Sequence, residues 1–212
     1  TERRRIQGDA HDYLSRLLSG RPDALLIREK DLSDEALIRF AAPLVPIAER
    51  CGVPLILRGS AEEARQLGIS HLQLSFAEAI AAPLPQDFDN IGVSVHSLEE
   101  ALTAQKLGAD TVTYGHIFTS PCKPGLPPRG TAALDEIVRA CTIPVYAIGG
   151  ITADTLLTPN PSGSRLSYER QHDRSGTGDP HHASPSHSRT SINRNTSTTD
   201  SPLGRGGVFL LH

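Results

Sequence analysis

Short apolar runs alternate with amphipathic helical patterns over residues 1–156. Six runs rich in aliphatic and β-branched residues predict strands. They are Ala24–Arg28, Val53–Leu57, His71–Leu74, Ile91–Val95, Thr111–Tyr114 and Pro144–Ile148. Between them, capping residues open predicted helices, namely Ser33 to about Cys51, Ser60 to Gly68, Ser97 to Gly108 and Thr131 to about Ala140.

This regular alternation predicts an α/β fold with a parallel sheet covered by helices. The unit recurs at intervals of roughly 20 to 30 residues, which suits a (β/α)₈ TIM barrel better than a short open sheet. A doubly wound sheet is the alternative, because periodicity alone does not separate the two folds.

From Leu157 onward the pattern ends. Residues 157–212 are rich in Ser, Thr, Pro, Arg, Gly and His, and hold five of the nine histidines. Without an apolar period such a segment buries too little surface to offset its chain entropy, so a disordered tail is one interpretation. A frameshift is the other, because codons for residues 168–172 can be chosen so that a one-base shift reads Met-Ser-Gly. The predicted organisation is therefore a barrel over 1–156 and a low-complexity tail over 157–212.

Composition narrows the function classes. A net charge of −3 provides no basic field for nucleic acid, and no apolar stretch is long enough to suggest a membrane span. The three cysteines, Cys51, Cys122 and Cys141, are too widely spaced for a disulfide framework or a metal motif, so a reducing cytoplasm is expected. The absence of Met at position 1 suggests a piece of a longer chain.

The strongest chemical signal is the segment 115–130, which directly follows a predicted strand. In a barrel, loops after strands build the active site. His116 can give and accept protons near neutral pH, and Lys123 and Arg129 can hold an anion. Cys122 lies close enough in sequence to raise a Cys/His nucleophile as an alternative.

Further candidates follow other strands. Gly149 and Gly150 end the Pro144–Ile148 strand, where backbone N–H groups can bind phosphate. Arg28 and Lys30 flank Glu29 and share one side of an extended segment, where they can bind a second anion or form part of a solvated charge run. Ser94 and Ser120 complete the predicted substrate-binding residues.

Five runs carry a family resemblance: LIREK, IGVSVHSLEEA, LGAD, GHIFTSPCKPGLPPRG and IPVYAIGGI. In order and spacing they resemble the thiamin phosphate synthase and TenI superfamily over residues 1 to about 156. The resemblance implies a (β/α)₈ barrel that handles a thiazole ethyl phosphate. Thr1–Arg3 resembles the stretch just after the first family strand, so the barrel is expected to lack its first strand and, through the frameshift, its eighth.

The Gly115-His116 pair and the run from Cys122 to Gly130 are similar to the TenI branch. This resemblance implies a thiazole tautomerase that aromatises a carboxythiazole phosphate by proton transfer, with His116 as the acid and base. It implies no metal and no cofactor. The expected partner is a small thiazole phosphate, and a homo-oligomer is left open.

Thiamin phosphate synthase is the alternative enzyme. It couples the thiazole phosphate to a pyrimidine diphosphate with Mg²⁺ held by acidic residues. Where the synthase has Asn-Asp this chain has Arg58-Gly59, its second acid falls near Glu78, and a family Gln is Leu26. Mg²⁺ needs oxygen ligands, so these changes count against the synthase. A non-catalytic regulatory or decayed relative is the third hypothesis.

Overall fold

The strands of this protein follow one another across a single parallel sheet. The computed structural model describes residues 1–120, 123, 125–152, 155 and 208–211, the last as backbone only. The sheet order is β1-β2-β3-β4-β5-β6-β7, which is also the chain order. The strands are β1 (Leu25–Ile27), β2 (Leu55–Leu57), β3 (His71–Ser75), β4 (Asn90–Val95), β5 (Thr111–Gly115), β6 (Val145–Ile148) and β7 (Val208–Leu211).

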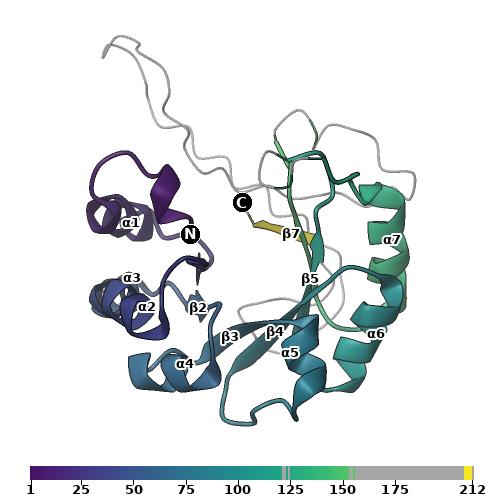
Figure 1. Cartoon of the computed structure of the whole chain (residues 1–212), viewed down its shortest axis with the longest axis horizontal. Helices are drawn as coiled ribbons and strands as arrows, with labels where there is room; N and C mark the ends of the chain where they lie inside the picture. Colours follow the sequence, from purple (N-terminus) through teal and green to yellow (C-terminus); the bar gives the residue numbers. More distant parts are fainter. Residues whose placement is uncertain (121–122, 124, 153–154, 156–207, 212) are drawn as a thin grey trace.

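Helices lie on the outside of the curled sheet (Figure 1). They are α1 (Ala10–Ser19), α2 (Asp34–Ala41), α3 (Val45–Cys51), α4 (Ala61–Leu67), α5 (Phe76–Ala81), α6 (Leu98–Lys106) and α7 (Gly130–Ala140), with 3₁₀ turns η1 (Arg3–Arg5) and η2 (Ala42–Leu44). The TIM-like α/β fold predicted from the sequence is confirmed. A doubly wound sheet is excluded, because the strand order never reverses.

The helix predicted from Ser33 to Cys51 is divided into α2, η2 and α3. Pro43 lies within η2 and Pro46 at the start of α3. Proline has no N–H to donate and its ring crowds the preceding turn, so one continuous α-helix cannot form across both. Two helices were not predicted: α1, whose N-cap is Asp9, and α5, which opens with a capping box of Ser75 and Glu78.

The two faces of the sheet differ in chemistry. Leu72, Ile91, Val93 and Val112 alternate with polar residues and belong to the buried core shared with the helices. The opposite face carries Gln73, Ser94, Thr111 and Thr113, and Gln73 Nε2 donates to Ser94 Oγ at 3.0 Å. Because side chains alternate across a strand, the inner face of the curl is polar along β3 to β5, whereas the helix-facing side is apolar.

Both edges of the sheet have a neighbouring segment. Among the described strands β1 pairs only with β2, and Thr1 lies along its other side, where Arg28 N donates to Thr1 Oγ1 at 3.2 Å. At the opposite edge β7 pairs in parallel with β6, from Val145 with Val208 to Ile148 with Leu211. This strand was not predicted from the sequence. The remainder of the predicted tail, including the frameshift signal at 168–172, lies outside the described residues.

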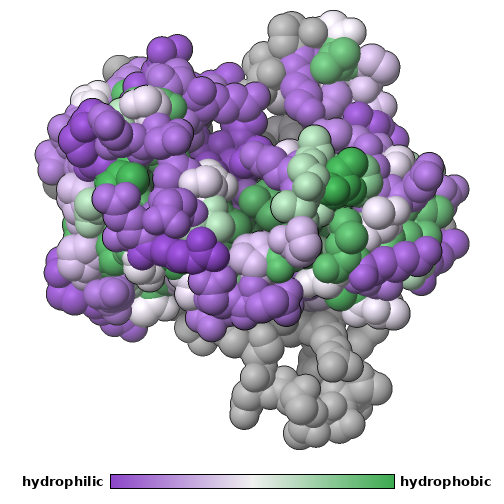
Figure 2. Space-filling view, turned by 60° about the horizontal axis from the view of Figure 1, so that its bottom comes forward, coloured by the Kyte–Doolittle hydropathy of each residue, from purple (hydrophilic) through white to green (hydrophobic). Residues whose placement is uncertain are grey.

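Hydrophobic side chains also reach the surface in places. Figure 2 shows one face on which they gather in patches among hydrophilic residues. The large exposed hydrophobic residues of the described part are Ile80, Leu107 and Leu126. Scattered apolar residues are usual on protein surfaces, so this face does not define a binding site.

Replacing Ser60 by Ala is expected to destabilise the protein by about 1 kcal/mol. Ser60 Oγ accepts from Glu63 N, and the buried Glu63 carboxylate accepts from Ser60 N, so the change removes half of a capping box. Urea unfolding measures the effect. Ser33→Ala is the matched control, because the Ser33 cap is exposed and long at 3.4 Å, and should cost less. Equal costs would contradict the importance of the buried box.

Candidate functional site

The carboxyl ends of β1 and β2 bring arginines together. Arg58 N donates to Ile27 O at 2.9 Å, which extends the β1–β2 ladder by one residue beyond the strands. Arg28 and Arg58 therefore stand next to each other at the ends of their strands. Together with Glu29 and Lys30 they line a cavity of about 370 Å³.

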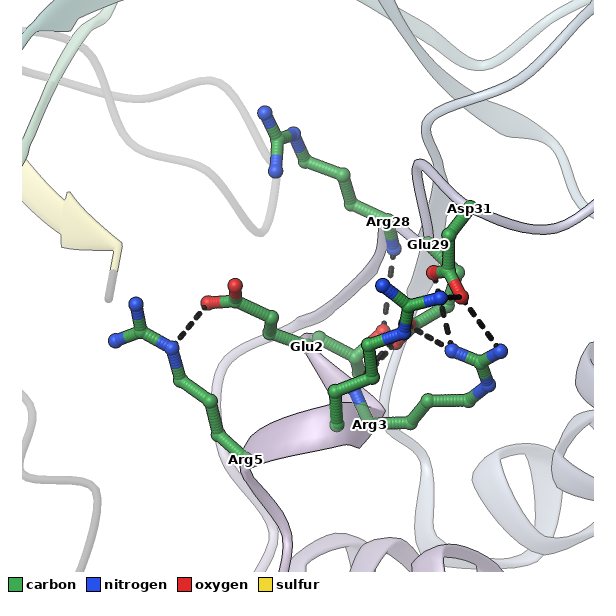
Figure 3. Close-up of polar contacts among 8 residues, drawn as sticks. Glu2, Arg3, Arg5, Arg28, Glu29 and Asp31 are labelled. Atoms are coloured by element: carbon green, nitrogen blue, oxygen red, sulfur yellow. Dashed lines mark hydrogen bonds and ion pairs between the residues drawn. The ribbon is translucent and has the colours of Figure 1, made fainter. Parts of the chain in front are cut away.

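Glu29 is turned away from this cavity. Its side chain is only 2% exposed, and its two carboxylate oxygens accept from Arg3 N at 3.0 and 3.1 Å. Arg3 also forms a bidentate pair with Asp31 at 3.0 and 2.7 Å. Figure 3 shows the Arg28 side chain pointing away from this group. The Glu29 carboxylate is therefore occupied by Arg3, while Arg28 extends away from that contact.

Lys123, on the loop after β5, lies within the same positive field. Desolvation lowers its pKa, and the charges of Arg129, Lys30 and Arg28 lower it further. These interactions connect the loop after β5 with the end of β1. Arg28 and Lys30 thus share one end of the sheet with Lys123 and Arg129, more than 90 residues further along the chain, an arrangement that favours a bound anion.

Arg129 holds the loop rather than pointing freely into the cavity. Its Nε donates to Gly115 O at 3.0 Å and its Nη1 to His96 O at 2.7 Å. Arg129 N also donates to His116 O at 3.0 Å. Arg129 was predicted to hold an anion, but these contacts tie its side chain to backbone carbonyls around the loop, which leaves Lys123 as the freer cation of this loop.

His116 is buried at the junction of the β5 and β6 ends. It is 5% exposed, its Nε2 lies 3.4 Å from Leu126 O, and its Nδ1 has no hydrogen-bond partner. Gly149 packs directly on it: a Cβ at Gly149 would lie 2.4 Å from His116 Cβ. Gly150 is equally crowded, since a Cβ there would lie 2.4 Å from Thr119 O. Both glycines have positive φ angles, 98° and 67°.

The two predicted serines occupy different places. Ser94 lies on the polar inner face, bonded to Gln73. Ser120 is buried in the loop after β5, and its carbonyl accepts from Lys123 N at 3.0 Å. The structure brings Arg28, Lys30 and Lys123 into one group and His116, Gly149 and Gly150 into another. Cys122 of the Cys/His alternative lies outside the described residues.

The residues present do not fit a magnesium site. Gly59 stands where the resemblance implies a metal carboxylate and has no side-chain ligand to offer, while the neighbouring Arg58 is paired with Glu78 at 3.2 and 2.9 Å. Partial burial would raise the pKa of Glu78, but hydrogen bonds from Ser75 and the charge of Arg58 lower it overall. Within the described part of the chain, no group of three or more His, Cys, Asp or Glu side chains could hold a metal ion. The Arg58–Glu78 pair was missed by sequence reasoning, although a Ser-x-x-Glu spacing marked the helix start that positions Glu78.

Comparisons with known proteins agree with the fold. A family model described as thiamine monophosphate synthase matches residues 1–159. A thiamine-phosphate synthase from Roseiflexus castenholzii is 34% identical over 149 residues, which cover 66% of this chain and 64% of that protein. A putative thiamine-phosphate synthase 2 from Aquifex aeolicus is 30% identical over 155 residues, covering 72% of this chain and 83% of the relative. A solved thiamine phosphate pyrophosphorylase from Pyrococcus furiosus superposes with a TM-score of 0.60 at 27% identity, covering 72% of this chain and 74% of that one.

These relatives contradict the prediction of a thiazole tautomerase. Proteins that are 30 to 34% identical are named for the synthase, which was the alternative hypothesis. The motif of Gly115-His116 and the following loop was therefore a poor guide to the branch. Separately, none of the helices described has the length and apolar character needed to cross a membrane.

Gly149→Ala is expected to destabilise the protein by about 2 kcal/mol more than Gly108→Ala. Both glycines have nearly the same φ, 98° and 96°, but a Cβ at Gly108 meets nothing within 4 Å. Comparing the two variants therefore separates the steric clash with His116 from the free-energy cost of placing alanine at a positive φ. Denaturant unfolding of the two variants checks this. Similar losses would show that the contact with His116 relaxes easily.

Affinity for inorganic phosphate is expected to fall as pH rises, and to begin falling at a lower pH than it would if Lys123 had the usual pKa of a lysine. The attraction of Lys123 is present below its pKa and is lost as pH rises through it, and that pKa is lowered. Calorimetric titration across alkaline pH measures the decline. In the Lys123→Arg variant the side chain stays charged, so the affinity should fall much less with pH. An unchanged pH profile in this variant would show that Lys123 does not bind the anion.

Proposed function

The chain belongs to the thiamine monophosphate synthase and TenI superfamily, and from this membership we propose that it catalyses formation of thiamine phosphate. In the proposed reaction a thiazole nitrogen attacks the methylene carbon of a pyrimidine methyl diphosphate. A C–N bond forms, the C–O bond to the diphosphate breaks, and the diphosphate leaves with the electron pair. Both substrates are small and strongly anionic.

The observation that carries the proposal is the group of cations at the carboxyl end of the sheet. Arg28 and Lys30 line the cavity, and the field of both reaches Lys123. A departing diphosphate accumulates negative charge, so cations fixed in place before reaction stabilise that charge without reorganising. Arginine adds bidentate geometry that matches phosphate oxygens.

Other residues have supporting roles in this proposal. Gly149 and Gly150, at the end of β6, provide backbone N–H groups for the single phosphate of the thiazole. Ser94 and Ser120 offer hydroxyl groups at the ends of β4 and β5. His116 packs against Gly149, and Arg129 holds the loop that carries Lys123 through its hydrogen bonds.

The family chemistry implies Mg²⁺, but the donor set of this chain does not fit it. The position of the metal carboxylate is Gly59, and Glu78 is paired with the neighbouring Arg58. No step of the proposed reaction is therefore assigned to a metal. The residues named above bind and orient the substrates and offset the charge of the leaving group.

Arg28→Gln is expected to lower kcat/KM for thiamine phosphate formation by at least about 10-fold, the loss typical of one charge-assisted contact to a reacting group. Chromatographic detection of thiamine phosphate from the two phosphorylated substrates measures the rate. Lys106→Gln, at the exposed end of α6, is the control and should leave the rate unchanged. No product from the unmodified chain, with or without Mg²⁺, would overturn the proposed function.

A further inference from the structure

Arg58 places a positive charge next to Gly59, the position at which the family resemblance implies a metal-binding carboxylate. It lies at the end of β2, held beside Arg28 by the hydrogen bond from its own N–H to Ile27 O. Its side chain is 26% exposed and lines the cavity that Arg28 and Lys30 also line. A ligand in this cavity would therefore meet three cationic side chains from two neighbouring strand ends.

The carboxylate of Glu78 offsets part of the charge of Arg58, with which it is paired. Glu29 belongs to the lining, but its carboxylate is 2% exposed and bound to the Arg3 backbone on the far side of the segment. Lys123 adds its field from the loop after β5. Like charges held this close repel one another, and a polyanion placed among them removes that cost.

Glu78 fixes the direction of the Arg58 side chain. Nη1 and Nη2 of Arg58 contact Oε1 and Oε2 of Glu78 at 3.2 and 2.9 Å, and Ser75 Oγ donates to Glu78 Oε2 at 2.6 Å. A guanidinium has five N–H groups. The contacts with Glu78 use two of them, so further donors are available to a ligand in the cavity.

We propose that Arg58, positioned by Glu78, replaces the divalent metal at this end of the sheet, so that a diphosphate group beside Arg28 and Lys30 is bound without Mg²⁺. The identity of the natural diphosphate ester rests on the proposed function, but binding of the diphosphate group itself does not. Glu78 is then a positioning residue for Arg58 and not a metal ligand.

Calorimetric titration of the full chain with inorganic pyrophosphate tests this directly. Binding in EDTA should be at least as tight as binding with Mg²⁺. Arg58→Gln should weaken it by 10-fold or more, and Arg58→Lys should restore part of the loss. Arg65→Gln is the matched control, because Arg65 also forms a bidentate pair, with Asp87 at 2.7 and 3.0 Å, outside the cavity. Binding that requires Mg²⁺, or that is unchanged in Arg58→Gln, would overturn the proposal.

Glu78→Gln separates the two roles open to this carboxylate. If Glu78 only positions Arg58, removing its charge releases guanidinium donors and strengthens pyrophosphate binding several-fold in EDTA. If Glu78 holds a metal, the same change weakens binding in Mg²⁺ and has no effect in EDTA, which would refute the inference. Because the Arg58–Glu78 pair is partly exposed, both variants should fold, and circular dichroism with a thermal transition verifies this before titration.

The binding assay and the coupling assay fail independently. Pyrophosphate binding in EDTA without any thiamine phosphate formation would disprove the proposed function and leave the metal-free site standing. Thiamine phosphate formation only in Mg²⁺, with no pyrophosphate binding in EDTA, would do the reverse. Coupling that persists in EDTA and is lost in Arg58→Gln would support both.

Discussion

Parallel pairing is the constraint on which the rest of this molecule depends. Strands that run in the same direction all end at one side of the sheet, so residues far apart in sequence meet there. Arg28 follows β1, Arg58 follows β2, and Lys123 follows β5 by eight residues. Hydrogen bonding between main chains, rather than attraction between side chains, assembles these cations. The repulsion among them is tolerated because the sheet is held by its own ladder and core.

The second group of candidate residues, around His116, Gly149 and Gly150, depends on the close approach of two main chains. The main chains continue side by side beyond the paired ends of β5 and β6, where Ile117 N donates to Ile148 O and Phe118 N to Gly149 O, both at 3.0 Å. Glycine at 149 and 150 is required by this packing as well as by the positive φ angles. The same two glycines were predicted from sequence as a phosphate-binding turn. Tight packing alone therefore accounts for glycine at both positions, and phosphate binding by their N–H groups stays a prediction.

Six of the seven described strands were predicted from the sequence, because aliphatic and β-branched residues recur in them, whereas β7 lies in a segment without such a pattern around it. It failed where the decisive contact joins distant residues. Arg58 and Glu78 were interpreted one at a time, Arg58-Gly59 as the loss of a metal carboxylate and Glu78 as lying near the position of a second acid. Their pairing depends on β2 lying next to β3, which no local pattern contains. The capping box of Ser75 and Glu78 was a visible signal for α5 that was not used. Arg129 could not be assigned between ligand and loop, because its acceptors are backbone carbonyls, which carry no residue identity.

The opposite orientation of Glu29 relative to Arg28 and Lys30 has a consequence for how a ligand arrives. The chain as a whole is negative, with a formal charge of −3, yet the cavity presents positive charge because the intervening carboxylate is sequestered. At distances beyond the Debye length an anion senses mainly the whole protein, whereas within it the local cations dominate. Added salt therefore eases the approach of the ligand and shortens its residence once bound. Association and dissociation rates respond to ionic strength through different parts of the same charge distribution.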